Sequence, residues 1–281
     1  MYDVAIIGSG PAAISAALTL KLHNKSIIWF GSNKLSPKVE KSERIANYPG
    51  VPMVTGPELN RLYREQIGAM GLKVTELQVT NIAASRRAFM VLGGSDIYEA
   101  KAVLLATGAV SGKGFPGEAE LLGHGVSYCA TCDGFLYRGK TIAVYCGSKE
   151  FEHEVTYLAE IAEKVFLFTP YACELTRENI VVNPGKMKAI LGEKKANGVE
   201  LLDSTMLDVD GVFILRTAVA PANLIKGIEL SGADIVVDRS MATNKPGVFA
   251  AGDCTGRPYQ LTKAVGEGNI AAHSIVAYLN G

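Results

Sequence analysis

Two cysteines separated by two residues, Cys129 and Cys132, are the side chains of this sequence best suited to redox chemistry. Cysteines at this spacing can close a reversible disulfide, and a neighbouring helix terminus lowers the thiol pKa so that the attacking thiolate forms. Asp133 follows directly and is well placed to supply or take a proton. Two alternatives stay open: a structural Cys-x-x-Cys pair, and an Asp133 that only serves the turn before Gly134.

The remaining cysteines form no comparable group. Cys146, Cys173 and Cys254 are scattered along the chain, and we expect them to be buried thiols. An odd set of five cysteines in a reducing cytosol is not a disulfide framework. Zinc would need a second pair of ligands at suitable spacing, and the four histidines are isolated, so the sequence predicts no metal site.

The overall composition is that of a globular protein. Of the 281 residues, 48% are hydrophobic and 20% are charged, which allows a sizeable core. Lys plus Arg and Asp plus Glu number 28 each, so the formal charge of zero gives no support to nucleic acid as a partner. The N-terminus shows no signal-peptide pattern, and no apolar run reaches the roughly 18 residues of a membrane helix. We therefore expect a cytoplasmic protein without a membrane anchor.

The first thirty residues predict a unit that binds a dinucleotide. A strand over Asp3–Ile7 and a helix over Ile14–Leu22 flank the turn Gly8-Ser9-Gly10-Pro11-Ala12-Ala13, and a second strand follows at Ser26–Phe30. The turn matches G-x-G-x-x-A directly after a strand and before a helix, which is the context that this motif requires. Its glycines let the backbone approach a pyrophosphate, and the helix N-terminus faces the negative charge.

Further elements follow along the chain. The pattern predicts a helix over 57–70, a buried strand from Lys101 to a turn at Gly108, and a Pro/Gly-rich linker over Ser111–Gly117. A second strand–loop–helix begins at Thr141, a strand covers Lys164–Thr169, and residues 171–217 are interpreted as a further short α/β segment. A last strand, Gly247–Ala251, precedes a helix at about Gly266–Leu279. One domain, 1–111 and 218–281, is therefore interrupted by a second domain, 112–217.

Several stretches together resemble the low-molecular-weight thioredoxin reductases. They are Gly8-Ser-Gly-Pro-Ala12, Asn47-Tyr-Pro-Gly50, Ala106-Thr-Gly108, Gly125-Val-Ser-Tyr-Cys-Ala-Thr-Cys-Asp-Gly134 and Gly247-Val-Phe-Ala-Ala-Gly-Asp253. The resemblance covers essentially the whole chain. It implies an α/β protein of two Rossmann-like (FAD/NAD(P)-binding type) domains, the second inserted into the first and truncated. The first domain would bind FAD, and the inserted one would carry the redox disulfide, with Cys132 nearer the flavin.

The same resemblance places a set of residues at the FAD. They are Gly8, Gly10, Pro11, Ala12, Gly31, Ser32, Asn47, Thr107, Gly108, Gly252, Asp253, Gln260 and Leu261. The sequence departs from the family at three places. No acidic residue follows the second strand, about Ser36-Pro37-Lys38 replaces a Gly-Gly-Gln, and Tyr259 stands where an arginine is usual.

The loop of the second strand–loop–helix departs further from a nucleotide site. Cys146, Ser148 and Phe151 take the three fingerprint positions, and a Cβ at the second position blocks backbone approach to phosphate. Glutamates at 150, 152 and 154 add negative charge where the helix dipole should attract an anion. The arginines that relatives use for the 2′-phosphate of NADPH are missing, since the first one after the next strand is Arg177. NADPH bound in some other way stays open.

This loss resembles the pyridine-nucleotide-independent branch of the family, the ferredoxin-dependent flavin thioredoxin reductases. The resemblance implies FAD as cofactor, thioredoxin and ferredoxin as partners, a homodimer, and a domain rotation with hinges near Ser111–Gly114 and Arg216–Ala220. An acidic ferredoxin favours a basic patch. Two sets of residues are candidates for it: Lys186, Lys188, Lys194 and Lys195, or Lys34, Lys38, Lys41 and Arg44. The rival hypotheses are a reduced deazaflavin or atypically bound NADPH as donor, and a redox-sensing flavoprotein without turnover.

Overall fold

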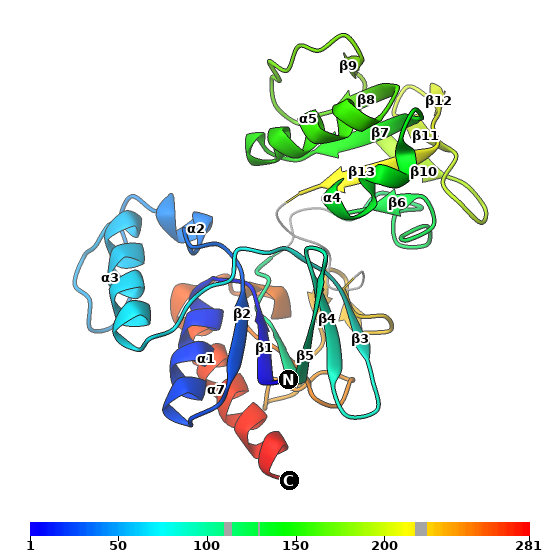
Figure 1. Cartoon of the computed structure of the whole chain (residues 1–281). Coiled ribbons are helices and arrows are strands. Elements are labelled where there is room, and N and C mark those ends of the chain that lie inside the picture. The colour runs from blue at the N-terminus through cyan, green and yellow to red at the C-terminus, as the bar shows by residue number, and fades with distance from the viewer. Residues whose placement is uncertain (110–113, 129, 217–223) are drawn as a thin grey trace. The chain divides into compact units, whose positions relative to one another are not determined.

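The computed structural model describes residues 1–109, 114–128, 130–216 and 224–281, and of Cys132 it describes the backbone only. The chain divides into two compact units, traced by colour in Figure 1. Unit 1 joins Met1–Ser111 to Leu224–Gly281, and unit 2 is the intervening Gly112–Asn223. The second unit is thus inserted into the first.

Unit 1 is built on a mixed sheet. Its strands are β1 (Tyr2–Ile7), β2 (Ile27–Phe30), β3 (Val79–Ala84), β4 (Phe89–Gly93), β5 (Asp96–Leu105) and β16 (Val248–Ala250). The order is β2-β1-β5-β4-β3, with β1, β2, β5 and β16 parallel to one another. β4 pairs antiparallel with the first half of β5, and β16 pairs with its last residues. A small hairpin of β14 (Leu230–Ser231) and β15 (Asp234–Ile235) completes the unit.

The helices of unit 1 begin at recognisable signals. They are α1 (Pro11–Leu22), α2 (Pro37–Glu40), α3 (Gly56–Ala69), the short 3₁₀ helix η3 (Asp253–Thr255) and α7 (Leu261–Asn280). Thr55 and Glu58 form a capping box at the start of α3, each side chain accepting the other's backbone N–H. Ser36 caps α2 in a similar way, by accepting from the N–H of Val39. None of the described helices is both long and apolar enough to cross a membrane.

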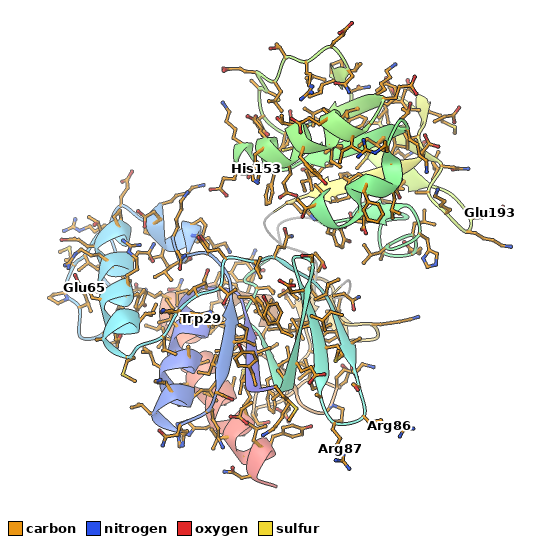
Figure 2. All side chains as sticks on the ribbon, in the orientation of Figure 1. Trp29, Glu65, Arg86, Arg87, His153 and Glu193 are labelled. Carbon is orange, nitrogen blue, oxygen red and sulfur yellow. The ribbon has the colours of Figure 1, made fainter. Side chains whose placement is uncertain are left out.

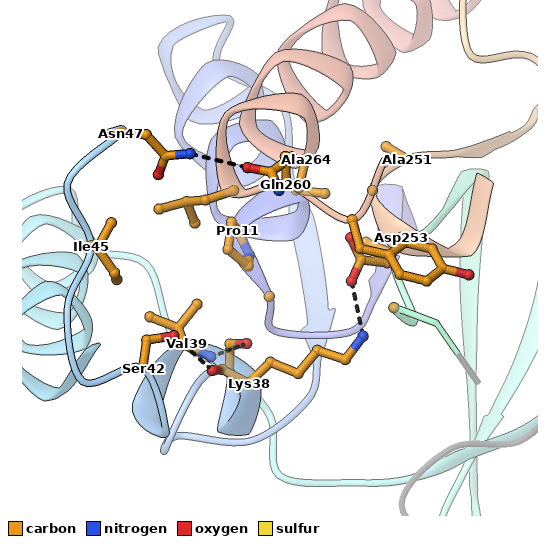
Figure 3. A pocket seen from close by; sticks show the side chains of 18 of the residues that line it. Pro11, Lys38, Val39, Ser42, Ile45, Asn47, Ala251, Asp253, Gln260 and Ala264 are labelled. Atoms are coloured by element: carbon orange, nitrogen blue, oxygen red, sulfur yellow. Dashed lines mark hydrogen bonds and ion pairs between the residues drawn. The ribbon is translucent and has the colours of Figure 1, made fainter. Parts of the chain in front are cut away.

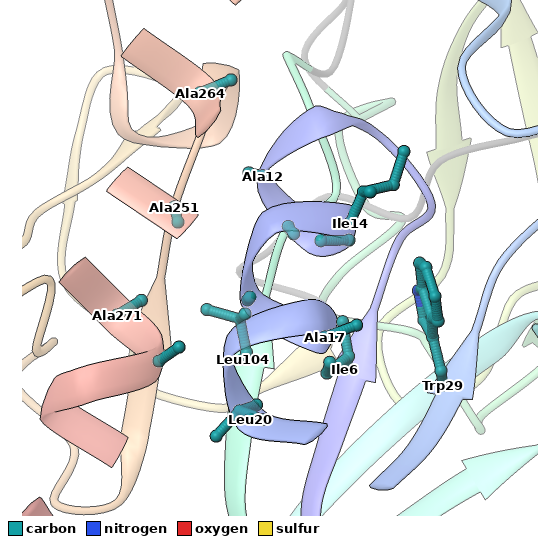
Figure 4. Packing of buried hydrophobic residues seen from close by; sticks show 14 of the residues in the cluster. Ile6, Ala12, Ile14, Ala17, Leu20, Trp29, Leu104, Ala251, Ala264 and Ala271 are labelled. Carbon is teal, nitrogen blue, oxygen red and sulfur yellow. The ribbon is translucent and has the colours of Figure 1, made fainter. Parts of the chain in front are cut away.

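The core of unit 1 lies between the sheet and the paired helices α1 and α7 (Figure 4). Ile6, Leu20 and Leu104 are fully buried there. Trp29 is buried as well, and its indole N–H donates to the carbonyl of Gly8 at 2.7 Å, which ties β2 to the turn after β1. Figure 2 shows Trp29 inside the unit, whereas Arg86 and Arg87 extend outward from the β3–β4 turn.

Unit 2 contains a parallel sheet and a smaller antiparallel one. Its strands are β6 (Val126–Ser127), β7 (Thr141–Cys146), β8 (Lys164–Phe168), β9 (Ile180–Val182), β10 (Met187–Leu191), β11 (Gly198–Leu201), β12 (Met206–Asp208) and β13 (Gly211–Leu215). The order β6-β13-β7-β8-β9 is parallel throughout, and β10-β11-β12 is antiparallel. Its helical elements are α4 (Ala130–Asp133), η1 (Gly134–Tyr137), η2 (Lys149–Phe151) and α5 (Glu152–Ile161). Val144, Val155 and Leu158 are fully buried in the core between α5 and the parallel sheet.

The predicted α/β fold with two Rossmann-like units is confirmed, with corrections to individual elements. α1 begins at Pro11 rather than Ile14, because Gly10 already serves as its cap. α7 begins at Leu261 rather than near Gly266. The segment 171–217 is not α/β, since its described residues form strands β9 to β13 and no helix. The linker predicted over Ser111–Gly117 is too long, because the N–H of Ile190 in β10 donates to the carbonyl of Pro116.

One glycine of α7 sets how closely this helix approaches α1. A Cβ on Gly268 would collide with the backbone carbonyl of Ala12, whereas a Cβ on Gly266, on the exposed face of α7, would meet nothing within 4 Å among the described residues. We predict that Gly268→Ala lowers the free energy of unfolding by about 1 to 3 kcal/mol through overpacking. Gly266→Ala should raise it by up to about 1 kcal/mol, because alanine favours a helix over glycine. Chemical denaturation measures both, and equal effects of the two variants would contradict the packing argument.

Candidate functional site

Unit 1 contains a pocket of about 480 Å³ at the carboxyl ends of its parallel strands (Figure 3). Ligands of open α/β sheets bind at this end of the strands. Four segments that are distant in sequence line the pocket. The lining residues are Gly10, Pro11, Ala12, Ser36, Lys38, Val39, Ser42, Arg44, Ile45, Asn47, Ala106, Gly108, Ala251, Gly252, Asp253, Tyr259, Gln260, Leu261 and Ala264.

The turn between β1 and α1 forms the base of the pocket. Gly8 has φ +115°, a conformation that favours glycine, and a Cβ there would collide with the carbonyl of Ala106. Gly10 caps α1 without any side chain, and the first turn of the helix carries no acidic residue. The backbone N–H groups that begin α1 therefore face the pocket beside Gly10, Pro11 and Ala12, where the helix dipole favours an anion.

The end of β2 is fastened to this turn. The hydroxyl of Ser9 accepts the N–H of Ser32 at 3.0 Å and donates to the carbonyl of Leu35 at 3.3 Å. A Cβ on Gly31 would come within 2.6 Å of the Ser9 Cβ, so only glycine lets β2 end this close to the turn. Gly31 and Ser32 thus adjoin the dinucleotide turn without lining the pocket. Gly8 and Thr107 do not line the pocket either. Gly8 lies against Ala106, and Thr107 stands between the lining residues Ala106 and Gly108.

Two polar bridges join the walls of the pocket. Lys38 of α2 forms an ion pair with Asp253 of η3 at 2.9 Å. Asn47 donates from its side-chain amide to that of Gln260 at 3.1 Å. Figure 3 shows both pairs reaching across the pocket. The segment 36–47 and the segment 253–260 are therefore held together although more than two hundred residues separate them.

The pocket collects most of the residues predicted at FAD. Those that line it are Gly10, Pro11, Ala12, Asn47, Gly108, Gly252, Asp253, Gln260 and Leu261. Sequence reasoning missed the wall formed by Ser36, Val39, Ser42 and Ile45. Ser36-Pro37 was a usable signal, since a serine followed by proline is typical of a helix start. Tyr259 lines the pocket where the family usually has an arginine, and it contacts Lys38 by a cation–π interaction at 5.2 Å.

The predicted redox cysteines lie at the edge of what the structure describes. Cys129 and the side chain of Cys132 lie outside the described residues. Asp133 ends α4, and its carboxylate accepts a hydrogen bond from the hydroxyl of Ser127 at 2.6 Å. This bond orients the carboxylate that the sequence marks as a proton donor or acceptor.

A second carboxylate contacts the same short helix. Glu154, in the first turn of α5, accepts a hydrogen bond from the backbone N–H of Ala130, the residue after Cys129. Burial raises the pKa of Glu154 above its usual value despite this bond. Sequence reasoning treated Glu154 only as a charge unfavourable to a nucleotide, because no local pattern links α5 to α4.

The loop after β7 is filled by side chains where the first unit has open glycine backbone. Cys146 is fully buried, with its sulfur 3.2 Å from both the Tyr171 hydroxyl and the Ser148 carbonyl. Phe151 and Tyr171 pack against the core of unit 2. The 3₁₀ helix η2 stands between this loop and α5, so α5 does not begin at the loop as α1 does at Gly10.

Charge at the start of α5 also opposes an anion. Glu152 and Glu154 occupy its first turn, and the Cys173 thiol donates to the Glu152 carboxylate at 3.6 Å. Carboxylates of the protein itself therefore occupy the helix N-terminus where a phosphate would bind. At this second loop, side chains fill the space and negative charge disfavours the phosphates of a nucleotide.

The three scattered cysteines differ in burial. Cys146 and Cys254 are buried, as predicted, whereas Cys173 is only half-buried. Burial raises the pKa of Cys254 to about 11 and also raises the pKa of Cys146. Thiols with raised pKa values are poor nucleophiles at neutral pH.

Comparison with known proteins gives consistent matches over almost the full length. Residues 2–268 match the family model described as "Pyridine nucleotide-disulphide oxidoreductase". The thioredoxin reductase of Listeria monocytogenes is 32% identical over 99% of this chain and 94% of its own. A ferredoxin-flavin thioredoxin reductase from Clostridium acetobutylicum is 41% identical, with a TM-score of 0.91 over 99% of this chain and 97% of its own. A thioredoxin reductase from Gloeobacter violaceus is 32% identical, with a TM-score of 0.80 over 99% and 94%.

A substitution at Gly10 can test ligand binding with little effect on folding. Its φ of −79° suits any residue, and among the described residues no atom lies within 4 Å of the position that a Cβ would take. We predict that Gly10→Val lowers the free energy of unfolding of the ligand-free protein by no more than about 1 kcal/mol, the usual loss at a helix N-cap. The added side chain would occupy the space beside the helix N-terminus, so the flavin content of the purified protein should fall at least roughly tenfold. Absorbance and thermal unfolding measure the two effects, and full flavin content in the variant would contradict this assignment of the pocket.

Proposed function

Because the chain belongs to the pyridine nucleotide-disulphide oxidoreductase family, and within it to the thioredoxin reductases, we propose that it reduces thioredoxin through Cys129 and Cys132 with electrons from reduced ferredoxin. The chain is an FAD-binding flavoprotein oxidoreductase. The observation that carries the choice of donor is the contrast between the two strand–loop–helix units. One is open and faces a pocket, and the other is filled by its own side chains.

The pocket of unit 1 fits FAD. Glycine backbone and the unobstructed N-terminus of α1 suit the pyrophosphate, beside Gly10, Pro11 and Ala12. The side chains of Asn47 and Gln260 would border the flavin ring, and Asp253 the ribityl chain. When bound, FAD supplies the chemistry of collecting two single electrons and passing them on as a pair.

NADPH is disfavoured by the loop after β7. Tyr171 and Cys146 fill the loop, and Glu152 adds a negative charge at the start of α5, so a pyrophosphate would meet both steric and electrostatic opposition. A solved relative with 41% identity is a ferredoxin-flavin thioredoxin reductase, which supports ferredoxin as the replacement.

The redox energetics favour transfer in this direction. Plant-type ferredoxins lie near about −400 mV, and thioredoxin lies near about −270 mV. A gap of about 130 mV corresponds to roughly 6 kcal/mol for two electrons. Two reduced ferredoxins and two protons therefore suffice to convert one thioredoxin disulfide into a dithiol.

The cysteines carry the electron pair to thioredoxin. The Cys129–Cys132 disulfide takes up two electrons and two protons and becomes two thiols. The thiolate of Cys129 then attacks the thioredoxin disulfide and forms a mixed disulfide, and one thioredoxin sulfur leaves as a thiol. Cys132 displaces the second thioredoxin sulfur and restores the original disulfide. Asp133, oriented by Ser127, supplies and recovers the proton.

Other parts of the proposal rest on resemblance to the family. The disulfide has to serve the flavin and thioredoxin in turn, so we infer a rotation of unit 2 relative to unit 1. The hinges expected near Ser111–Gly114 and Arg216–Ala220 lie largely outside the described residues. We further propose a homodimer in the cytoplasm.

The choice of donor can be tested directly. The purified protein with bound FAD is mixed with oxidised thioredoxin and either NADPH or a reduced bacterial ferredoxin, and thiol formation is followed. We predict turnover with ferredoxin and, with NADPH, a rate at least about a hundredfold lower, because the nucleotide has no site in unit 2. Rapid turnover with NADPH, or none with ferredoxin, would overturn the proposal.

A cysteine variant distinguishes the hypothesis of a thioredoxin-reducing enzyme from that of a redox sensor without turnover. Cys132→Ser should retain flavin reduction by ferredoxin and lose thioredoxin reduction, because the disulfide can no longer form. Thioredoxin reduction that persists in this variant would exclude the dithiol route. Wild-type protein whose flavin is reduced without any thiol formation on thioredoxin would instead be a sensor.

The pair Asp133 and Ser127 gives a second test. Asp133→Asn removes the proton donor and should slow thioredoxin reduction roughly a hundredfold. Ser127→Ala leaves the carboxylate but removes its 2.6 Å hydrogen bond, so we expect a smaller loss. Neither variant should alter flavin reduction by ferredoxin. An Asp133→Asn variant with wild-type turnover across pH would leave Asp133 as a turn residue.

A further inference from the structure

Exposed cations stand around the mouth of the pocket in unit 1. Lys38 and Arg44 line the pocket, and Lys41 lies between them on the same segment. Arg257 contacts the same Tyr259 ring as Lys38, with its guanidinium 5.3 Å from the ring centroid. We call these four residues the basic rim.

The local structure turns three of these cations outward. Val39 and Ile45 are buried, and the N–H of Gly56 donates to the carbonyl of Ser42, so the segment is fixed against α3. Positions 38, 41 and 44 recur every third residue and are all exposed. The nearby acid Glu40 accepts a hydrogen bond from the Asn60 amide of α3 at 2.6 Å. Glu43 is an exposed acid of the same segment and opposes the local positive charge.

Two exposed apolar side chains lie within the basic rim. Tyr259 is 43% exposed, with Lys38 and Arg257 both in cation–π contact with its ring. Met53 is 56% exposed, and its sulfur lies 2.6 Å from the Nε of Arg44. Met53 also has φ +41°, a left-handed conformation that long side chains rarely adopt. Exposed apolar and aromatic side chains beside charged ones are common in protein interfaces.

The alternative basic patch of unit 2 is less suitable. Lys188 is paired with Glu200 at 2.6 Å, as Lys38 of the basic rim is with Asp253 at 2.9 Å, so pairing does not separate the two patches. This patch belongs to unit 2, whereas the pocket that fits FAD belongs to unit 1. A carrier that delivers electrons to the flavin has to dock where the flavin is bound.

We propose that the basic rim, together with Tyr259 and Met53 that contact it, is the docking surface for a small acidic iron–sulfur protein that carries one electron. This inference rests on the proposed function and names the place where its electron donor binds. Each thioredoxin disulfide needs two electrons, so two carriers must dock and leave in succession. Opposite charges speed such encounters, and a small interface lets the oxidised carrier dissociate quickly.

The test reverses charges that do not line the pocket. Lys41→Glu and Arg257→Glu, alone and combined, are compared with Lys194→Glu, which makes the same charge change on unit 2. Stopped-flow absorbance follows flavin reduction by a reduced bacterial ferredoxin at low and high salt. We expect the double variant to lose roughly tenfold in the second-order rate constant at low salt and to lose most of its salt dependence. Lys194→Glu should match the wild type, and Glu43→Lys should accelerate reduction.

A neutral small reductant provides the internal reference. Photoreduced 5-deazariboflavin should reduce the flavin of every variant at the wild-type rate, because it needs no charged docking surface. If ferredoxin reduces the wild type and the double variant equally fast, the docking surface is wrong while the proposed function stands. If ferredoxin fails to reduce the wild type although the deazaflavin succeeds, both the proposed function and the docking surface are overturned.

Discussion

The close approach of three backbone segments at the base of the pocket is the constraint on which unit 1 depends. Gly8 lies against the carbonyl of Ala106, Gly268 lies against the carbonyl of Ala12, and Gly252 lies close to the Ala12 side chain. The first, middle and last parts of unit 1 meet there with no room for a Cβ. This contact brings α7 onto α1 and places η3 opposite α2, so the pocket walls follow from it. The chain leaves unit 1 after Ser111 and returns to it at Leu224, so the inserted unit contributes none of these contacts.

The two strand–loop–helix units show that one backbone arrangement can either accommodate a phosphate or exclude it. Both have a parallel strand, a tight connection and a helix. In unit 1, glycine backbone and an unobstructed helix N-terminus leave room and positive potential for a phosphate. In unit 2, Cys146 and Tyr171 fill this space, and Glu152 adds negative charge at the start of α5. The parallel sheet beneath persists because its stability comes from side chains such as Val144 and Leu158, which are fully buried in the core.

Local patterns predicted the parts of the fold that local physics determines. The strand β1, the glycine turn and the helix α3 were all readable, because each depends on neighbours within a few residues. The strands between residues 171 and 216 were misjudged, since their pairing depends on distant partners such as Val212 opposite Ala143. At the site, the glycine turn was predictable, but the wall at α2 was not. Its position depends on Lys38 meeting Asp253 across 215 residues of sequence.

The discontinuous origin of the pocket has a consequence for synthesis of the chain. The residues that line it run from Gly10 to Ala264, so no cofactor site exists until the ribosome has made nearly the whole protein. Unit 2 is continuous in sequence and emerges complete while unit 1 still lacks its last strand and α7. Because domains fold as units during translation, the inserted unit can reach its native state first. Cofactor loading then indicates that synthesis has passed Ala264, since a shorter product lacks part of the pocket.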